Sequence, residues 1–283
     1  MKKHTSRKWV LLLVHFCCVI MIAESQELYV FTEPASNMPA RSISAKYTAK
    51  LLEGYHSRRL EQRHTPEIMF GLNKNWMLHV ATTFSDMYSS NIRWESARLY
   101  AKYRFLSVDD VHKHFRIAAF AEVAHSANDL FYDELALEGD QSGVQGGLIF
   151  TQLVKKLAVS ATVSYLQVTT PKAKPFAEAY PYQAFNYTAS AGYLILPVNY
   201  TDYKQTNLNL YAELIGQQTL DRKRYFVDFA PALQLIFNSN TKLNLGYRFQ
   251  LNSNMHRMAL RSWLVSFERT FLNALSSRKK KKT

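Results

Sequence analysis

The stretch Leu157-Ala158-Val159-Ser160-Ala161-Thr162-Val163-Ser164-Tyr165 decides the fold. Its odd positions are apolar or aromatic, whereas its even positions hold small or polar side chains. Because successive side chains of a β-strand point to opposite faces, this pattern predicts a strand with one apolar face and one face of small or polar side chains. The preceding arm, from Gly143, alternates more weakly, and Lys155-Lys156 separates the two arms. We therefore predict a hairpin in which Gly146 lies opposite Tyr165, an aromatic ring covering a glycine.

The same alternation recurs along most of the chain. Together with the two hairpin arms it predicts twelve strands, the other ten being residues 42–51, 66–72, 76–84, 95–105, 115–123, 185–195, 207–214, 225–237, 242–251 and 258–271. No stretch after the first 25 residues has a helical pattern. We therefore expect an all-β fold with antiparallel neighbours.

Two all-β architectures compete for this pattern. A soluble sandwich or small barrel buries its apolar face, whereas a membrane barrel turns that face to lipid and keeps a polar lumen. The strands are about as long as the ~9–11 residues that cross a bilayer at a tilt, and aromatic residues recur near their ends. Long polar connections alternate with short turns, which also favours the membrane barrel. The sequence therefore predicts an antiparallel up-and-down transmembrane β-barrel of about 12 strands, formed by residues 41–272.

The N-terminal residues 1–25 have the composition of a secretory signal peptide. A basic segment from Lys2 to Lys8 precedes an apolar run, and Ala23-Glu24-Ser25 is a small-x-small cleavage site. Both cysteines, Cys17 and Cys18, lie inside this segment, so the exported chain would use no disulfide. Residues 26–40 have little pattern, and we interpret them as an extended periplasmic N-terminal segment. A disordered leader, a plug and an added strand remain alternatives for it.

The net charge of +13 lies largely at the two ends of the chain. Residues 273–283 form a basic tail that ends in the run Arg278 to Lys282. Elsewhere the basic residues do not form one face interleaved with aromatic side chains, so we expect no nucleic-acid partner. His56, Arg58, Arg59, Arg63 and His64 crowd the first predicted outside loop, where they could bind lipopolysaccharide phosphates or simply be solvated.

Several stretches resemble known proteins. Trp263-Leu264-Val265-Ser266-Phe267-Glu268-Arg269-Thr270-Phe271 is similar to the aromatic-ended final strand of Gram-negative outer-membrane β-barrels, although residues 273–283 follow it. Residues 109–116 and 138–143 are similar to stretches of uncharacterised outer-membrane barrels of Bacteroidetes. The resemblance covers the mature chain at the level of architecture. It implies export to the cell outer membrane, insertion by the barrel-assembly machinery and contact with outer-membrane lipid and lipopolysaccharide.

Charges are arranged unevenly around the long connection of residues 127–142. From Ile117 to Val154 there are six acids and no Lys or Arg. We consider as lumen or constriction residues the acids Glu122, Asp129, Asp133, Glu134, Glu138 and Asp140 together with the basic Arg98, Lys102, Arg104 and Arg116. If the loop folds into the barrel, its acids would face a basic wall and create a transverse field that orients polar solutes. The alternative is a solvated outside loop and lumen charges that only pair, such as Arg98 opposite Glu122.

Candidates for other chemistry are weaker. Asp109, Asp110, His112 and His114 could bind zinc or copper, but they fall in a polar connection where such residues are common. No His-x-Ser pair lies on an outward strand face, and nucleophilic catalysis needs a base beside the nucleophile. We therefore expect neither an enzyme nor a cofactor.

The predicted function is a passive porin or channel for small solutes. The alternative is a structural or adhesive outer-membrane barrel that binds partners through its outside loops. The sequence gives neither the solute nor the oligomeric state.

Overall fold

The computed structural model describes residues 29–54, 59–111, 113–169, 180–198, 202 and 204–276. The predicted signal peptide and the basic run from Arg278 lie outside these residues. In the part of the chain that is described, no helix is long and apolar enough to cross a bilayer.

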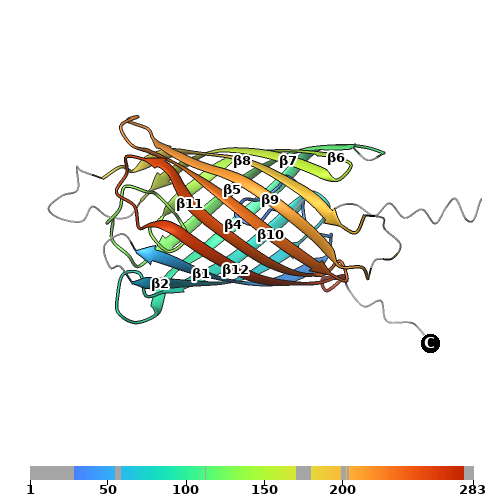
Figure 1. Ribbon diagram of the computed structural model, residues 1–283, viewed down its shortest axis with the longest axis horizontal. Coiled ribbons are helices and arrows are strands. Elements are labelled where there is room, and N and C mark those ends of the chain that lie inside the picture. Colours follow the sequence, from blue (N-terminus) through green and yellow to red (C-terminus); the bar gives the residue numbers. More distant parts are fainter. Residues whose placement is uncertain are drawn as a thin grey trace, which may run out of the picture.

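Twelve antiparallel strands form one closed barrel, in which each strand pairs with its neighbours in sequence and β1 pairs with β12 (Figure 1). The strands are β1 (Ser42–Gly54), β2 (Leu60–Gly71), β3 (Trp76–Ser85), β4 (Arg93–Asp110), β5 (Lys113–Ser126), β6 (Gly143–Val154), β7 (Leu157–Val168), β8 (Gln183–Leu196), β9 (Asn207–Thr219), β10 (Tyr225–Phe237), β11 (Thr241–Ser253) and β12 (Ala259–Phe271). This confirms the predicted up-and-down barrel. Closure leaves no unpaired strand edge, which a spanning structure requires because lipid offers the backbone no hydrogen bonds.

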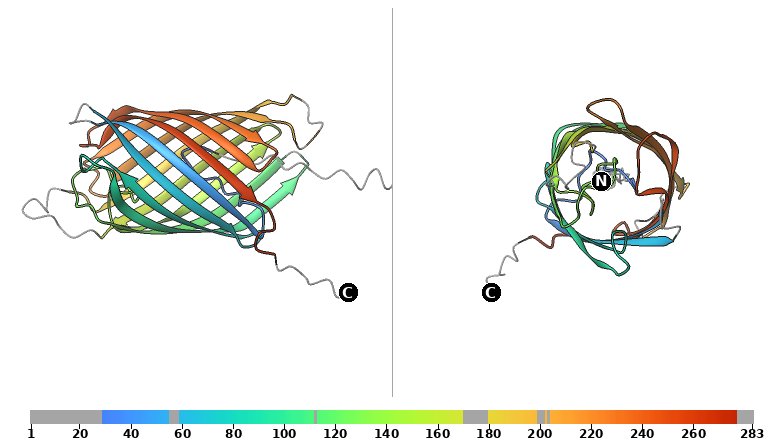
Figure 2. Two further views of the ribbon diagram at one scale, coloured as in Figure 1. Left: turned by 90° about the horizontal axis from the view of Figure 1, so that it is seen from below. Right: turned by 90° about the vertical axis from the view of Figure 1, so that its left-hand side faces the viewer.

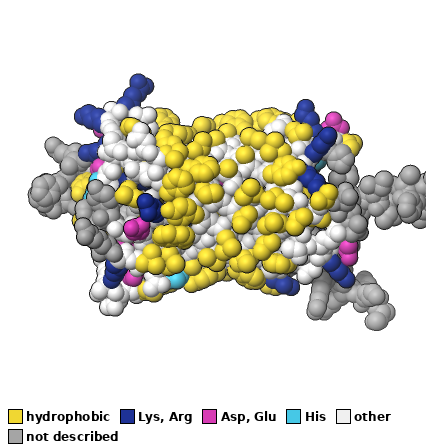
Figure 3. Space-filling view, viewed as in Figure 1, with side chains coloured by type: hydrophobic (Ala, Val, Ile, Leu, Met, Phe, Trp, Pro, Cys, Tyr) yellow, Lys and Arg dark blue, Asp and Glu magenta, His cyan; other side chains and the backbone are white. Residues whose placement is uncertain are grey.

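The hairpin that decides the fold forms as predicted. β6 and β7 pair with Gly146 opposite Tyr165 across the two-residue turn at Lys155-Lys156. On β7 the side chains of Leu157, Val159 and Val163 lie on the outer surface and are 44%, 47% and 51% exposed. The alternate small polar side chains of the strand face the lumen. On the face seen in Figure 3, a band of apolar side chains covers the middle of the barrel, and Lys and Arg gather near both rims. Such an outer surface suits contact with lipid.

The two ends of the barrel differ. We call the end that carries the connections after even-numbered strands, with the end of β12, the turn end. The other end, which carries the connection of residues 127–142 between β5 and β6, is the loop end. In Figure 1 the turn end is on the right.

The described part of the chain before β1 lies inside the barrel, as in the plug alternative given above for residues 26–40. Seen along the axis from the loop end, residues 29–40 (blue) lie within the ring of strands (Figure 2). Tyr29 and Val30 are buried against Tyr211 of β9 and Leu264 of β12. Ala35 is buried against Ala118 and Ile149. We call residues 29–40 the N-terminal segment.

Two connections predicted from the sequence were too long. Residues 60–65 were expected in a loop but begin β2, so Arg63 points into the lumen and His64 lies on the outer face against Tyr47. Residues 107–114 were expected to connect two strands, yet β4 extends to Asp110 and β5 begins at Lys113. In both places charged lumen-facing residues give the strand a polar composition that resembles a loop.

Candidate channel lumen

The lumen wall has two unlike halves. We call the inner faces of β6 to β9 the neutral half, because they carry small or uncharged side chains that include Gln145, Thr151, Ser160, Thr162, Ser164, Thr188, Ser190 and Asn209. Glu213 of β9 is the exception. The inner faces of β1 to β5 and β10 to β12 form the charged half, with Lys46, Lys50, Arg63, Glu67, Glu95, Arg98, Lys102, Arg116, Glu122, Asp228, Lys242, Arg248 and Glu268.

Glu213 fixes the N-terminal segment to the neutral half. This fully buried carboxylate accepts hydrogen bonds from the N–H groups of Val30 and Phe31, both at 3.0 Å, through Oε1. The hydroxyl of Thr32 donates to its Oε2 at 2.7 Å. A carboxylate is an acceptor with two oxygens, so it suits a stretch of chain that presents several donors.

Lys102 holds the same segment from the charged half. Its buried ammonium donates to the Glu33 carboxylate at 3.1 Å, to the Pro34 carbonyl at 2.7 Å and to the Ser36 carbonyl at 2.8 Å. Arg116 Nη1 donates to Ser36 Oγ at 2.9 Å. Two of the cations predicted to face the long loop therefore contact the N-terminal segment instead.

The long loop between β5 and β6 turns into the barrel. Leu130, Leu135 and Leu137 are buried against Leu166 and Val168 of β7 near the loop end. This apolar anchor positions the following acidic residues over the lumen. The sequence suggested that this loop could fold into the barrel. The apolar residues between its acids make that course possible because they pack against the wall.

Three acids of the loop meet cations of the charged half. Glu134 accepts from Arg257 Nε at 2.8 Å and from Arg248 Nη2 at 3.2 Å. Glu138 forms an ion pair with Lys50 and accepts from the Thr65 hydroxyl at 3.2 Å. Asp140 pairs with Arg63 at 2.6 Å. These partners lie at the loop end and are not the basic residues that the sequence suggested.

The environments of these acids shift their pKa values in opposite directions. Burial raises the pKa of Glu134, but the nearby Arg257 and Arg248 outweigh it and hold that pKa at about 2. Glu138 likewise has a pKa of about 2, because Lys50 and other cations outweigh its burial. Burial, with help from neighbouring carboxylates, raises the pKa of Asp140 to about 6 although Arg63 opposes it. Of these three acids, Asp140 is thus the one that titrates nearest to neutral pH.

Arg63 lies between two carboxylates. Its guanidinium is 2.6 Å from Asp140 and 3.3 Å from Glu95 of β4, and the exposed fractions of the Arg63 and Glu95 side chains are 5% and 0%. Tyr88, in the connection before β4, donates to Asp140 at 3.2 Å. One buried cation therefore joins β2, β4 and the loop.

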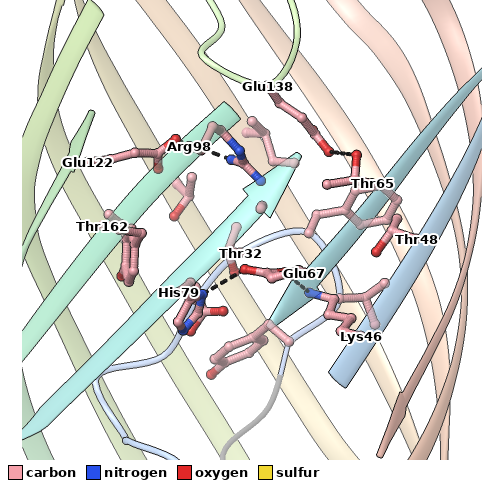
Figure 4. Close-up of a pocket in the computed structure, with 18 of the residues that line it drawn as sticks. Thr32, Lys46, Thr48, Thr65, Glu67, His79, Arg98, Glu122, Glu138 and Thr162 are labelled. Carbon is pink, nitrogen blue, oxygen red and sulfur yellow. Dashed lines mark hydrogen bonds and ion pairs between the residues drawn. The ribbon is translucent and has the colours of Figure 1, made fainter. Parts of the chain in front are cut away.

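A central cavity of about 350 Å³ lies between the N-terminal segment and the loop (Figure 4). Lys46 and His79 both contact Glu67, at 3.6 and 2.8 Å. Arg98 pairs with Glu122 at 3.2 Å. The predicted pair thus exists, but Arg98 lies opposite Ala124 and reaches Glu122 diagonally, so the predicted register was wrong by two residues.

Two further hollows continue the central cavity along the barrel. One of about 390 Å³ lies toward the turn end and shares Glu33 and Lys46 with the central cavity. Another of about 90 Å³ lies toward the loop end and shares Lys50, Glu138 and Arg248 with it. The smallest hollow is therefore the one at which the loop acids meet the cations of the wall.

The remaining predicted site residues lie apart. Asp129 is exposed, Asp133 pairs with Arg224 at 3.3 Å, and Arg104 donates to the Lys74 carbonyl at 2.8 Å. Five further residues of the site were not predicted as lumen residues: Lys50, Arg63, Arg248, Arg257 and Glu213. Lys50 and Arg248 had the correct strand parity, whereas Arg63 and Arg257 fell in predicted loops.

Asp109, one of the predicted metal ligands at the turn end, contacts its neighbours on β5. Asp109 is 2.7 Å from His114 Nδ1 and 3.0 Å from Arg116, and Asp110 lies opposite Lys113. His112 falls outside the described residues. Within the described chain, no three His, Cys, Asp or Glu side chains are grouped so that they could hold a metal ion.

Comparison with solved structures reveals the same fold in outer-membrane channels. An outer membrane channel from Pseudomonas putida F1 is 11% identical with a TM-score of 0.54, over 86% of this chain and 100% of the channel. The KdgM porin is 12% identical with a TM-score of 0.50, over 81% of this chain and 99% of the porin. The NanC porin is 10% identical with a TM-score of 0.50, over 80% and 98%. No family model matches the sequence, and no curated protein is similar to it. The chain therefore shares the barrel fold of outer-membrane porins and channels.

Proposed function

We propose that this protein is an outer-membrane channel that lets small polar solutes pass. The observation that carries the proposal is the run of three hollows along a polar lumen, inside a barrel whose outer face is apolar. The shared fold with porins supports the same conclusion. Residues 1–25 would act as the cleaved signal peptide, and the barrel-assembly machinery would then insert the barrel among outer-membrane lipids.

The constriction of this channel lies at the loop end. There Glu134, Glu138 and Asp140 project from the loop toward cations that include Lys50 and Arg248 of the wall. Opposed charges across a narrow passage orient dipolar solutes. This arrangement favours small solutes with separated positive and negative or hydrogen-bonding groups over apolar ones.

Planar-bilayer recording of the purified, folded protein tests the proposal. We expect stepwise conductance, and we expect Lys50→Ala and Arg248→Ala to shift the reversal potential in a salt gradient toward cation selectivity. Arg98→Ala, Lys102→Ala and Arg104→Ala serve as comparison variants, because Arg98 faces the central cavity and Lys102 and Arg104 lie nearer the turn end. Unchanged selectivity in all five variants would contradict a transverse electric field at the constriction.

A barrel that never conducts would instead support the structural or adhesive function. Of the described outside connections, the longest is the loop of residues 127–142, and its three leucines are buried inside the barrel. This loop therefore packs inside the lumen instead of extending outward to a partner, which favours the channel function over the adhesive one. Liposome swelling with small sugars separates the two functions, since a purely adhesive barrel would admit no solute.

A further inference from the structure

The lumen wall contacts the N-terminal segment largely through main-chain groups. Glu213 accepts from the N–H groups of Val30 and Phe31, and Thr151 Oγ1 accepts from the N–H of Ala35 at 2.9 Å. Lys102 donates to the carbonyls of residues 34 and 36. Every peptide has these groups, so this set of wall residues can bind peptide chains of more than one sequence.

Two side chains of the segment add selectivity. The Glu33 carboxylate accepts from Lys102 at 3.1 Å. Ala35, two residues later, is fully buried against Ala118 and Ile149, where a larger side chain would have to displace the wall. The site thus selects an acidic residue followed, two positions on, by a small one.

The neutral half provides the space for such a chain. Its small side chains leave room along β6 to β9. On the charged half, Gly246 of β11 lies beneath the Phe31 ring, where a Cβ would come within 2.6 Å of that ring. Thr151 also shares a hydrogen bond with Ser160 Oγ at 3.0 Å, which holds its hydroxyl in place. Wall residues that are themselves positioned give a prepared binding site.

We propose that Glu213, Thr151 and Lys102 form a peptide-binding site in the lumen, and that the N-terminal segment is its resident, displaceable ligand. Short extended peptides with the Glu-x-Ala spacing of residues 33 to 35 bind the same site and compete with the segment. This inference concerns binding and goes beyond the proposed channel function, because it holds whether or not the barrel conducts.

The test uses the full chain with Val30→Pro and Phe31→Pro, which remove the two N–H donors and leave the wall unchanged. A fluorescent peptide with the sequence of residues 29–36 is added to the folded protein in detergent, and its anisotropy is measured. We expect saturable binding at least about tenfold tighter than to the unaltered chain, whose tethered segment competes at high effective concentration. Equal, weak binding to both proteins would overturn the proposal.

Matched controls distinguish specific recognition of the peptide from nonspecific binding. A peptide with proline at the positions of Val30 and Phe31 should lose binding, and this change cannot affect folding of the barrel. Glu213→Gln in the wall should weaken binding about tenfold, because one of the charge-assisted acceptors is lost. Glu122→Gln makes the same chemical change in the partner of Arg98 and should leave binding unchanged. If both peptides bind alike, or both glutamine variants weaken binding alike, the site is not the one proposed.

Discussion

The two halves of the lumen wall accommodate polar groups inside the barrel in different ways. The charged half buries ionic groups and satisfies them with partners, as Arg63 does between Asp140 and Glu95. The neutral half has almost no charge, and its small hydroxyl and amide side chains provide a surface on which the N-terminal segment lies. The segment contacts both halves: Glu213 and Thr151 of the neutral half accept its N–H groups, and Lys102 of the charged half donates to its carbonyls. The loop acids, in contrast, pair with cations of the charged half.

The difference teaches that an alternating strand pattern alone does not fix the character of a lumen. Both halves belong to strands with the same alternation and the same apolar outer face. What distinguishes them is the size and charge of the alternate residues, which decides whether the neighbouring space takes side chains or main chain. Four predictions test this comparison.

The largest effect should follow Arg63→Ala in the charged half. Two buried carboxylates would then lose their shared cation, and breaking such a buried pair costs about 3–5 kcal/mol. Urea unfolding of the folded barrel, followed by tryptophan fluorescence, measures the loss. Arg261→Ala is the control, since its side chain is 60% exposed and its pair with Glu53 should contribute about 1 kcal/mol or less. Equal losses would mean that the Arg63 cluster contributes no more than a solvated ion pair.

A smaller loss should follow Val163→Arg on the outer face of the neutral half. An arginine facing the bilayer midplane costs about 2–4 kcal/mol. The neighbouring Thr162→Arg points into the central cavity, where water can solvate the new charge, so its cost should be much lower. Unfolding titrations in lipid vesicles compare the two. A greater loss for Thr162→Arg would contradict the assignment of outer and inner faces.

Thr151→Val tests how the neutral half holds the N-terminal segment. The substitution keeps the shape but leaves the buried N–H of Ala35 without its acceptor, which costs about 1–3 kcal/mol. Hydrogen exchange measured by mass spectrometry should show faster exchange in residues 29–40 and little change in β10 and β11. Thr162→Val, on the next strand of the same half, should leave the exchange of residues 29–40 as it is.

The smallest effect concerns pH. The pKa of Asp140 is raised to about 6 from its ordinary 3.8, so between these values the folded chain binds this proton more tightly than the unfolded chain. Its contribution to stability therefore grows as the pH falls through that window. Glu134 and Glu138, with pKa values of about 2, act in the opposite sense and contribute stability that is lost below about pH 4.5.

Channel selectivity should report the Asp140 proton directly. Protonation removes one negative charge from the constriction, so reversal potentials should shift toward anion selectivity with a midpoint near pH 6. Asp140→Asn should abolish this step and hold the acid-form selectivity at all pH values. A step that persists in Asp140→Asn would assign the titration to another group.

Much of the fold follows from the sequence because alternation is a local signal. The register of the β6–β7 hairpin was correct, since a two-residue turn leaves little freedom in pairing. The lengths of β2 and β4 were underestimated because lumen-facing charges such as Arg63 make a strand resemble a loop. The pairing of Arg98 was misplaced because β4 turns into β5 between Asp110 and Lys113, later in the chain than expected, and because the register shifts between Arg104 and Leu106.

The candidate site was less predictable because it depends on which segments enter the lumen. The acids of the long loop were identified, but their partners Lys50, Arg63, Arg248 and Arg257 are far away in sequence. Nothing local to residues 29–40 shows that Glu213 would accept their N–H groups. Such contacts follow from the course of the segment through the closed barrel, which brings residues 30 and 31 against β9.

The most direct test of the channel is single-channel recording of the purified, detergent-folded chain and of its Val30→Pro/Phe31→Pro variant. We expect discrete conductance steps from the unaltered protein and larger steps from the variant, because loosening the N-terminal segment widens the path along the neutral half. Folded barrels of both proteins that produce no steps at any voltage would contradict the assignment of this lumen as a passage for solutes.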